Sequence, residues 1–225
     1  MKITPVSYRP YKTNFLANYS KENNVVILGS SKNGKQIEEY CKIAAQTAEA
    51  VVRSGKNIIT GCGNSGIMGA AYYSAAKHSK KDSNNKPEQN LVILTEKLWG
   101  DENTDDCVVI GKAKTEGSRV DKFIENAKDF VIFPGSAGTM LEATSLISHN
   151  YYQGRLNPDM HRNIILVGKD CFKELDDLYK KLHEMELLAV NPSALYTIVD
   201  EADDILKELG VYQSNKVESE TDLEE

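Results

Sequence analysis

Two glycine-rich turns carry the residues of this sequence that are best suited to bind a ligand. Residues 60–69 read TGCGNSGIMG, and residues 133–142 read FPGSAGTMLE. Glycines let the backbone approach a ligand closely, and the free N–H groups at the start of a following helix favour an anion such as phosphate. A third turn, at residues 29–31, follows an apolar run. Each turn alone is equally well explained as a tight connection, but the three together indicate a nucleotide-like ligand.

The spacing of the glycines argues against the two commonest nucleotide motifs. Neither long turn is a P-loop, because neither ends in Gly-Lys-Ser/Thr. Gly61, Gly63 and Gly66 satisfy the G-x-G-x-x-G spacing of dinucleotide sites, but they follow the second predicted strand. The acid that such a site needs about 20 residues later is met only by Asp82, in a polar segment. We therefore expect no NAD, and the sequence predicts no bound cofactor.

The second turn places a carboxylate one turn into the helix that follows it. The pattern P-G-x-x-G-T-x-x-E comprises Pro134, Gly135, Gly138, Thr139 and Glu142. Together with the first turn, it resembles the Lonely Guy phosphoribohydrolases, a family long labelled lysine decarboxylase-like. The family's signatures are G-G-G-x-x-G-L-M-G and P-G-G-x-G-T-x-x-E, with an arginine about two dozen residues before the glutamate, where this chain has Arg119. Order and spacing agree from residue 25 to about residue 209.

The resemblance implies a hydrolase that cleaves the N-glycosidic bond of a nucleoside 5′-monophosphate, of the AMP or cytokinin riboside monophosphate type, to a free base and ribose 5-phosphate. Glu142 would stabilise an oxocarbenium-like transition state and orient or deprotonate the attacking water. Arg119 would hold the substrate or assist the departing base. The residues alone also allow a helix-dipole role for Glu142 and a surface role for Arg119. The substrate and its phosphate would be bound by Gly29, Ser30, Gly61, Gly63, Gly66, Gly135, Ser136, Gly138 and Thr139.

Four positions depart from the family pattern. Ser136 replaces a glycine, so a backbone that needs a positive φ there would carry a side chain. Cys62 replaces the middle glycine of the first turn, and we interpret it as a small buried residue. Val120 follows the arginine where the family usually has lysine. His149 stands at a commonly aromatic position, and we interpret it as a packing or helix-surface residue rather than a catalyst.

The elements that must position these residues follow a regular alternation. Residues 35–54 place Ile37, Tyr40, Ile43 and Val51 on one face at helical spacing. The expected strands are residues 25–29, 57–60, 91–95, 107–110, 129–133, 163–167 and 195–199, and the expected helices are residues 35–54, 65–78, 118–127, 138–152, 171–185 and 203–209. Continuous apolar strands between helices indicate a parallel sheet covered on both faces. We therefore predict a single-domain, Rossmann-like, doubly wound α/β fold with ligands at the carboxyl ends of its strands.

Charge and hydropathy set the domain bounds and exclude two kinds of partner. Residues 1–23 are predicted to be an extension, residues 24–210 the domain, and residues 211–225 an acidic, disordered tail. The chain has 27 Lys+Arg and 33 Asp+Glu, a net charge of −6, without a basic stripe. We therefore expect no nucleic-acid partner. No apolar run approaches the roughly 18 residues that a membrane helix needs, so we expect no membrane partner.

The cysteines and the family resemblance bear on location and assembly. The four cysteines are widely spaced, namely Cys41, Cys62, Cys107 and Cys171. They form no C-x-x-C pair and have no histidine nearby at zinc-ligand spacing, so we expect no metal and reduced thiols in a cytoplasmic protein. Family members are usually dimers or larger assemblies whose partner subunit borders the active site, so the resemblance implies a homodimer.

Three other functions stay open from the sequence. A nucleotide sensor or a carrier of a phosphorylated cofactor would use the same scaffold for binding without turnover. A purely structural subunit would bind no nucleotide. A PLP-dependent decarboxylase has the least support, because its chemistry needs a Schiff-base lysine and neither glycine turn contains a lysine.

Overall fold

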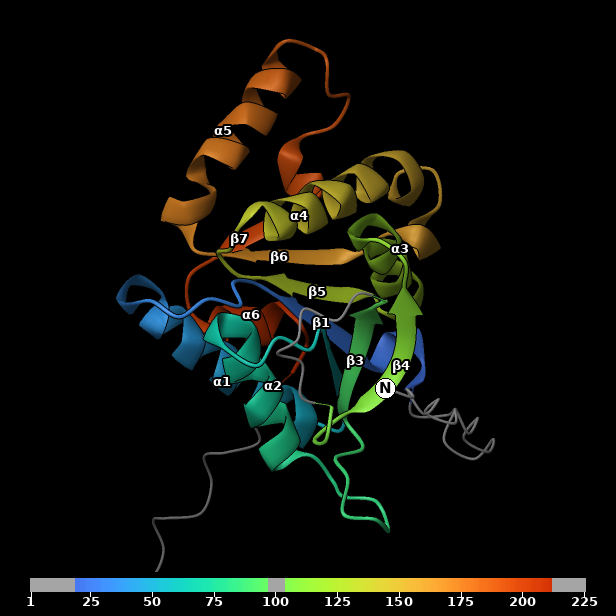
Figure 1. Cartoon of the computed structure of the whole chain (residues 1–225). Coiled ribbons are helices and arrows are strands. Elements are labelled where there is room, and N and C mark those ends of the chain that lie inside the picture. The colour runs from blue at the N-terminus through green and yellow to red at the C-terminus, as the bar shows by residue number, and fades with distance from the viewer. Residues whose placement is uncertain (1–18, 97–103, 212–225) are drawn as a thin grey trace, which may run out of the picture.

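A sheet of parallel strands forms the centre of the protein (Figure 1). The computed structural model describes residues 19–96 and 104–211. Within them the sheet has seven strands in the order β4-β3-β2-β1-β5-β6-β7, and every neighbouring pair is parallel. The strands are β1 (Asn24–Leu28), β2 (Asn57–Thr60), β3 (Asn90–Thr95), β4 (Val108–Ala113), β5 (Asp129–Ile132), β6 (Asn163–Val167) and β7 (Thr197–Val199).

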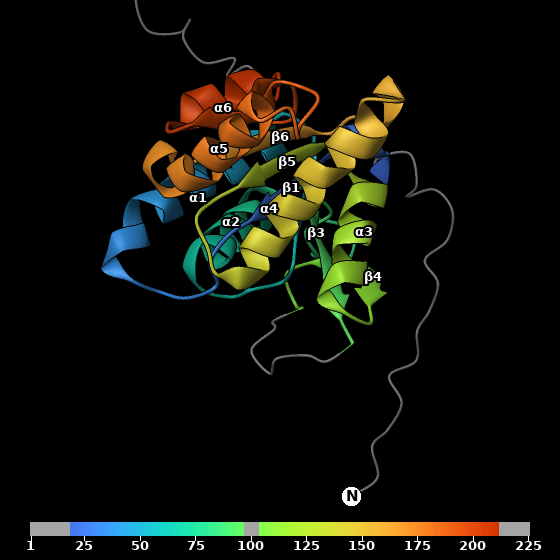
Figure 2. The same ribbon diagram turned by 90° about the horizontal axis from the view of Figure 1, so that it is seen from above.

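Helices connect these strands and cover both faces of the sheet, which confirms the predicted doubly wound α/β fold. The α-helices are α1 (Glu38–Arg53), α2 (Gly66–His78), α3 (Glu116–Asn126), α4 (Ala137–His149), α5 (Lys169–Glu184) and α6 (Ala202–Glu208). Figures 1 and 2 show α1, α2 and α6 on one face and α3, α4 and α5 on the other. Parallel strands joined by helical crossovers are buried on both sides, which explains their near-continuous apolar sequences.

Two apolar cores, one on each face of the sheet, hold the layers together. Along β1, Val25 and Ile27 face the α1, α2 and α6 side, whereas Val26 and Leu28 face the α3, α4 and α5 side. All four side chains are at most 1% exposed. Successive side chains of a strand point to opposite faces of the sheet, and here both faces are buried.

The strand order creates a switch point beside β1. The chain passes from β1 through β2 and β3 to the edge strand β4, and then returns to place β5 on the other side of β1. The helices that follow β1 and β5 therefore lie on opposite faces of the sheet. In open α/β sheets the ligand binds where such helices diverge, at the carboxyl ends of the strands.

Most predicted elements begin or end one to three residues from their observed bounds, and two of these differences have a clear structural cause. The helix predicted for residues 138–152 ends at His149 and continues as a π-helix, Asn150–Gly154. The Asn150 amide donates to the carbonyls of Arg162 and Leu195, both at 2.8 Å, and these buried bonds pull the chain out of α-helical register. The strand predicted for residues 107–110 extends to Ala113, because its backbone keeps pairing with β3 after the apolar run has ended.

Parts of the predicted terminal segments lie outside the described residues, namely 1–18 of the extension and 212–225 of the tail. The described end of the extension lies on the domain. The Tyr19 hydroxyl donates to the Glu88 carbonyl at 3.3 Å, and the Lys128 amide donates to the Lys21 carbonyl at 3.1 Å.

None of the helices in the described ranges is both long and apolar enough to cross a membrane.

Candidate functional site

The three glycine-containing turns meet around the backbone of Ser30, directly after β1. The Ser30 amide donates to the Pro134 carbonyl of the second long turn at 3.0 Å. The Ser30 carbonyl accepts hydrogen bonds from the amides of Ile67 at 2.9 Å and Met68 at 3.2 Å, at the start of α2. One residue therefore links the ends of β1, β2 and β5 at a single edge of the sheet.

Glycine is required at two of these contacts. A side chain on Gly135 would overlap the Thr139 hydroxyl and come within 3.1 Å of the Ser30 amide nitrogen. Gly66 has a φ of +61°, and a side chain there would lie 2.6 Å from the Ser30 carbonyl oxygen. These glycines serve the junction of the turns in the protein's own backbone, as well as any ligand that approaches it.

The structure reverses the expectation about the two replaced glycines. Ser136 has a φ of −88°, so its side chain causes no backbone strain and the suspected need for a positive φ there is wrong. The strained position is Cys62, with a φ of +65°. A left-handed conformation of this kind costs a non-glycine residue about 1 kcal/mol. Cys62 is only 1% exposed, as expected of a small buried residue.

Arg119 reaches the site from the first turns of α3, whose start is fixed by a capping box. The Ser118 amide donates to the Thr115 hydroxyl at 3.1 Å, and the Thr115 amide donates to the Ser118 hydroxyl at 3.0 Å. The Arg119 guanidinium then extends to the end of β2, where a side chain on Gly61 would lie 3.0 Å from its Nη1 atom. The absence of a side chain at Gly61 makes room for this arginine.

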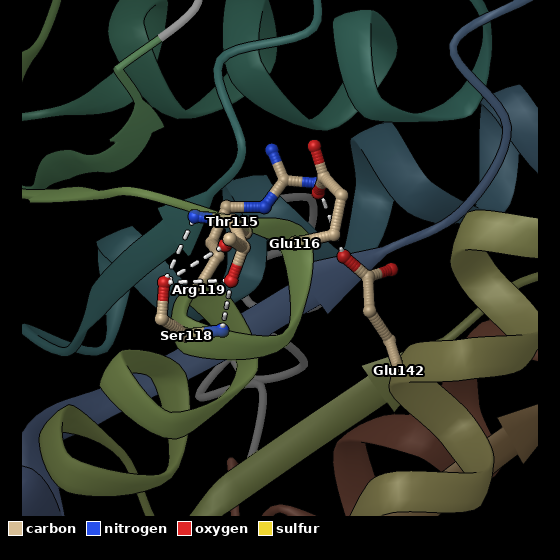
Figure 3. Close-up of polar contacts among 5 residues, drawn as sticks. All are labelled: Thr115, Glu116, Ser118, Arg119 and Glu142. Carbon is tan, nitrogen blue, oxygen red and sulfur yellow. Dashed lines mark hydrogen bonds and ion pairs between the residues drawn. The ribbon is translucent and has the colours of Figure 1, made fainter.

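Two carboxylates face the same guanidinium nitrogen (Figure 3). Arg119 Nη2 lies 2.6 Å from Glu116 Oε2 and 3.4 Å from Glu142 Oε1. Glu116 comes from the same helix, whereas Glu142 reaches across from α4. Thus the structure brings together the two residues for which catalytic roles were predicted, and it adds a third.

Glu142 is a buried carboxyl with an altered affinity for protons. Its side chain is 9% exposed. Burial raises the pKa of Glu142 from 4.5 to about 7, while the Arg119 charge opposes this rise and the Glu116 charge adds to it. A carboxyl that titrates near neutral pH can accept or donate a proton under ordinary conditions, as a general acid or base must.

The start of α4 offers free backbone donors beside this carboxyl. Gly135, Ser136, Ala137 and Gly138 are exposed, and no side chain caps the helix. The first amides of a helix lack intrahelical acceptors and carry the positive end of its dipole. Glu142 follows on the second turn of the same helix, so an anion held at these amides would place its organic part near the carboxyl.

The predicted ligand-binding residues separate into two groups by exposure. Ser30, Gly63, Gly135, Ser136 and Gly138 are accessible at the sheet edge. The other four are buried within the turns, namely Gly29, Gly61, Gly66 and Thr139. Contact with a ligand remains a prediction for all nine.

Val120 and His149, which also depart from the family pattern, take part in packing. Val120 is 3% exposed, so an apolar residue fills that position of α3. The His149 ring lies at the end of α4 with its Nε2 atom 2.9 Å from the Met160 carbonyl oxygen. It follows Glu142 by about 10 Å along the helix axis. Burial lowers the pKa of His149, and its surroundings fit the packing role that the sequence predicts.

One residue of the site was missed by the sequence analysis. Glu116 has the ordinary appearance of an acid in the first turn of a helix, which the helix dipole favours wherever it occurs. Its position three residues before Arg119 was the only available signal, because residues at that spacing are neighbours on a helix surface. Among the described residues, no group of three or more His, Cys, Asp or Glu side chains is placed to hold a metal ion.

Solved structures with the same fold have distant sequences. The molybdenum cofactor binding protein from Rippkaea orientalis is 16% identical, with 83% of this chain and 94% of that chain covered and a TM-score of 0.55. The Moco carrier protein from Chlamydomonas reinhardtii is 12% identical, with 83% and 96% covered and a TM-score of 0.51. Likeness at this level of identity establishes the fold alone. A comparison with curated proteins finds no match.

A family profile covers most of the domain. The family described as possible lysine decarboxylase matches residues 46–209. The match includes both long glycine turns, Arg119 and Glu142, which are the features that resemble the Lonely Guy proteins. The chain therefore belongs to the lysine decarboxylase-like, or Lonely Guy, family.

Proposed function

We propose that the protein hydrolyses the N-glycosidic bond of a nucleoside 5′-monophosphate, of the AMP or cytokinin riboside monophosphate type, to the free base and ribose 5-phosphate. The observation that carries the proposal is the arrangement around Glu142. This buried carboxyl has a pKa near 7, lies 3.4 Å from Arg119, and follows the exposed amides at the start of α4. Membership of the family supports the same reaction.

The proposed reaction assigns one step to each group. The 5′-phosphate binds the exposed amides of residues 135–138, which orients the ribose toward Glu142. The bond between the base nitrogen and C1′ breaks, and its electron pair leaves with the base. The ionised Glu142 carboxylate stabilises the positive charge on the sugar and takes a proton from the water that attacks C1′. The departing base anion takes up a proton from Glu142 or from solvent, which gives the free base and restores the carboxylate. Arg119 holds the substrate or assists the departing base.

The name of the family does not by itself indicate decarboxylation. A PLP-dependent decarboxylase binds its cofactor through a lysine Schiff base, and neither glycine turn contains a lysine. The acid and arginine at the sheet edge match the needs of glycosidic hydrolysis better than those of a cofactor-bound carbanion.

Release of free base tests the proposal. The purified protein is incubated with each common nucleoside monophosphate and with prenylated AMP, and the products are separated by chromatography. We expect base release by the wild type and a loss of at least about 100-fold in Glu142→Gln, because general-base catalysis contributes on that scale. Asp121→Asn, on the exposed side of α3, is the matched control and should keep full activity. A wild type as inert as Glu142→Gln would refute the enzymatic proposal.

A second candidate is binding of a nucleotide or phosphorylated cofactor without turnover. It is favoured by the two structural relatives, which are named as a molybdenum cofactor binding protein and a Moco carrier protein. Calorimetry that detects tight nucleotide binding without base release would support it. A purely structural subunit predicts instead a melting temperature that no nucleotide changes.

We also propose a cytoplasmic homodimer. All four cysteines lie in the described ranges and none of them forms a disulfide, as is usual in a reducing compartment. Met140 and Leu141, which are 36% and 43% exposed, place apolar surface at the start of α4 beside the proposed phosphate site. A partner subunit that covers them would border the site. Light scattering of the purified protein measures the assembly directly.

A further inference from the structure

Arg119 divides its charge unequally between two carboxylates. Its Nη2 atom forms a close ion pair with Glu116 Oε2 at 2.6 Å, whereas it donates a long hydrogen bond to Glu142 Oε1 at 3.4 Å. Burial works in the opposite direction, because the Glu116 side chain is 41% exposed and that of Glu142 is 9% exposed. The buried acid, which needs a cation more, thus lies farther from the guanidinium.

The remaining contacts of Arg119 do not explain this pose. Its Nε atom is buried and bonds to no acceptor among the described residues. An unsatisfied buried donor of this kind costs about 1–3 kcal/mol. The guanidinium also lies 5.9 Å from the Phe123 ring and against Gly61, contacts that limit its movement without directing its hydrogen bonds. The ion pair with Glu116 is therefore the shortest polar contact of the guanidinium among the described residues.

Glu116 is well placed to hold the arginine without being part of the buried site. It is the first residue of α3, and the Thr115–Ser118 capping box fixes the backbone on both sides of it. Its own carboxylate is 41% exposed, so water screens its charge and limits what the pair contributes to folding.

We propose that Glu116 is a positioning residue, which draws Arg119 away from Glu142 in the free protein and so leaves the Glu142 carboxyl available to act on a bound substrate. Without Glu116, Arg119 would close on Glu142, and an arginine within contact distance favours the ionised form of a carboxyl. The tightly paired carboxylate would then be a weaker base. The role in catalysis rests on the proposed function, whereas the position of Arg119 does not.

The proposal is tested first in the ligand-free protein. Carbon-13 NMR follows the titration of the Glu142 carboxyl, which is assigned by its absence in Glu142→Gln. We expect the pKa of Glu142 to fall by about 1 unit in Glu116→Gln, because Arg119 moves closer and the Glu116 charge is removed. Glu116→Asp, whose shorter side chain holds Arg119 less well, should give a smaller fall. Asp121→Asn removes a charge from the exposed side of the same helix and should leave the titration unchanged.

The same substitution in a variant that lacks Arg119 separates an effect of Glu116 through Arg119 from a direct effect of the Glu116 charge on Glu142. If Glu116 acts through Arg119, most of the shift should disappear when Glu116→Gln is made in Arg119→Gln. An equal shift in both backgrounds, or no shift in either, would overturn the proposal. Base release supplies the catalytic readout: the rising limb of the kcat–pH profile should move to lower pH in Glu116→Gln by the same amount. If no nucleotide is hydrolysed, the proposed function fails, while the ligand-free titration still decides what Glu116 does.

Discussion

Glu142 combines two properties that oppose one another in most proteins. Its carboxyl is buried, yet the nearest cation is shared with another acid and lies 3.4 Å away. Burial therefore dominates, and the pKa rises to about 7 instead of falling as in a well-paired carboxylate. A strongly shifted pKa in a group that adjoins exposed helix amides is typical of a functional site rather than of a structural ion pair.

The raised pKa predicts how stability depends on pH. The folded protein holds the Glu142 proton more tightly than the unfolded chain, whose pKa is near 4.5, so the stability that the proton provides is complete below that pH and is lost as the pH rises through about 7. We expect Glu142→Gln, which stays neutral, to gain stability relative to the wild type between pH 5 and pH 8, by on the order of 3 kcal/mol.

Urea unfolding at several pH values measures this difference. The control, Asp121→Asn, removes an exposed acid and should give a curve parallel to that of the wild type. If Glu142→Gln and the wild type lose the same free energy of unfolding between pH 5 and pH 8, Glu142 does not carry a raised pKa.

The residues of the site were only partly predictable from the sequence. The order and spacing of Arg119 and Glu142 follow a recognisable family pattern, and the structure brings them together. Backbone conformation was not predictable in the same way, because Ser136 lies in an extended conformation that any residue adopts, while the positive φ belongs to Cys62. Glu116 could not be predicted as a site residue, because a glutamate is favoured in the first turn of any helix.

At the scale of elements, a single buried arginine joins the segments that support α4. Arg162 is 1% exposed, and its guanidinium donates to the carbonyls of Met160 at 2.7 Å and Ile124 at 3.3 Å. Its own amide donates to the Asn150 side chain at 2.8 Å, at the start of the π-helix. The end of α3, the π-helix and the start of β6 are thereby tied together.

Replacing this arginine by lysine should be costly despite the equal charge. A lysine nitrogen cannot reach the carbonyls of both Ile124 and Met160, so at least one buried acceptor would lose its partner. We expect Arg162→Lys to lower the free energy of unfolding by about 2–3 kcal/mol, measured by urea denaturation. The control is Arg155→Lys, an exposed arginine 4.9 Å from the Tyr151 ring, which should cost less than about 1 kcal/mol. Equal losses in the two variants would contradict a joining role for Arg162.

Element types could be predicted from hydrophobic periodicity, but some bounds could not. The strands Asn57–Thr60 and Asn163–Val167 agree with the prediction at both ends, because their apolar runs stop where their pairing stops. The end of α4 could not be predicted in this way. It depends on hydrogen bonds from Asn150 to residues 12 and 45 positions later, and such distant partners leave no periodic signal nearby.

At the scale of the whole molecule, the net charge of −6 is compatible with an anionic ligand. Total charge governs long-range association, whereas a phosphate at the start of α4 would experience mainly the local field of the free amides. The sheet supplies this field, because the parallel strands deliver the turns after β1, β2 and β5 to one edge. The predicted fold and the predicted place of the site at that edge thus follow from the same alternation of strands and helices.

The four cysteines allow the stability of different parts of the molecule to be compared in one experiment. Cys171 on α5 is exposed and Cys41 on α1 is partly buried, whereas Cys62 and Cys107 are 1% and 4% exposed in a small apolar cluster with Tyr72. A thiol reagent should therefore label Cys171 first and Cys41 next. Cys62 and Cys107 should label together and at least about 1,000-fold more slowly than Cys171, because their reaction requires opening of the region that contains the cluster. Mass spectrometry of timed samples measures each rate, and Cys171→Ser should remove the fast phase alone. Labelling of Cys107 well ahead of Cys62 would mean that the edge of the sheet at β4 opens independently of the turn that carries the site.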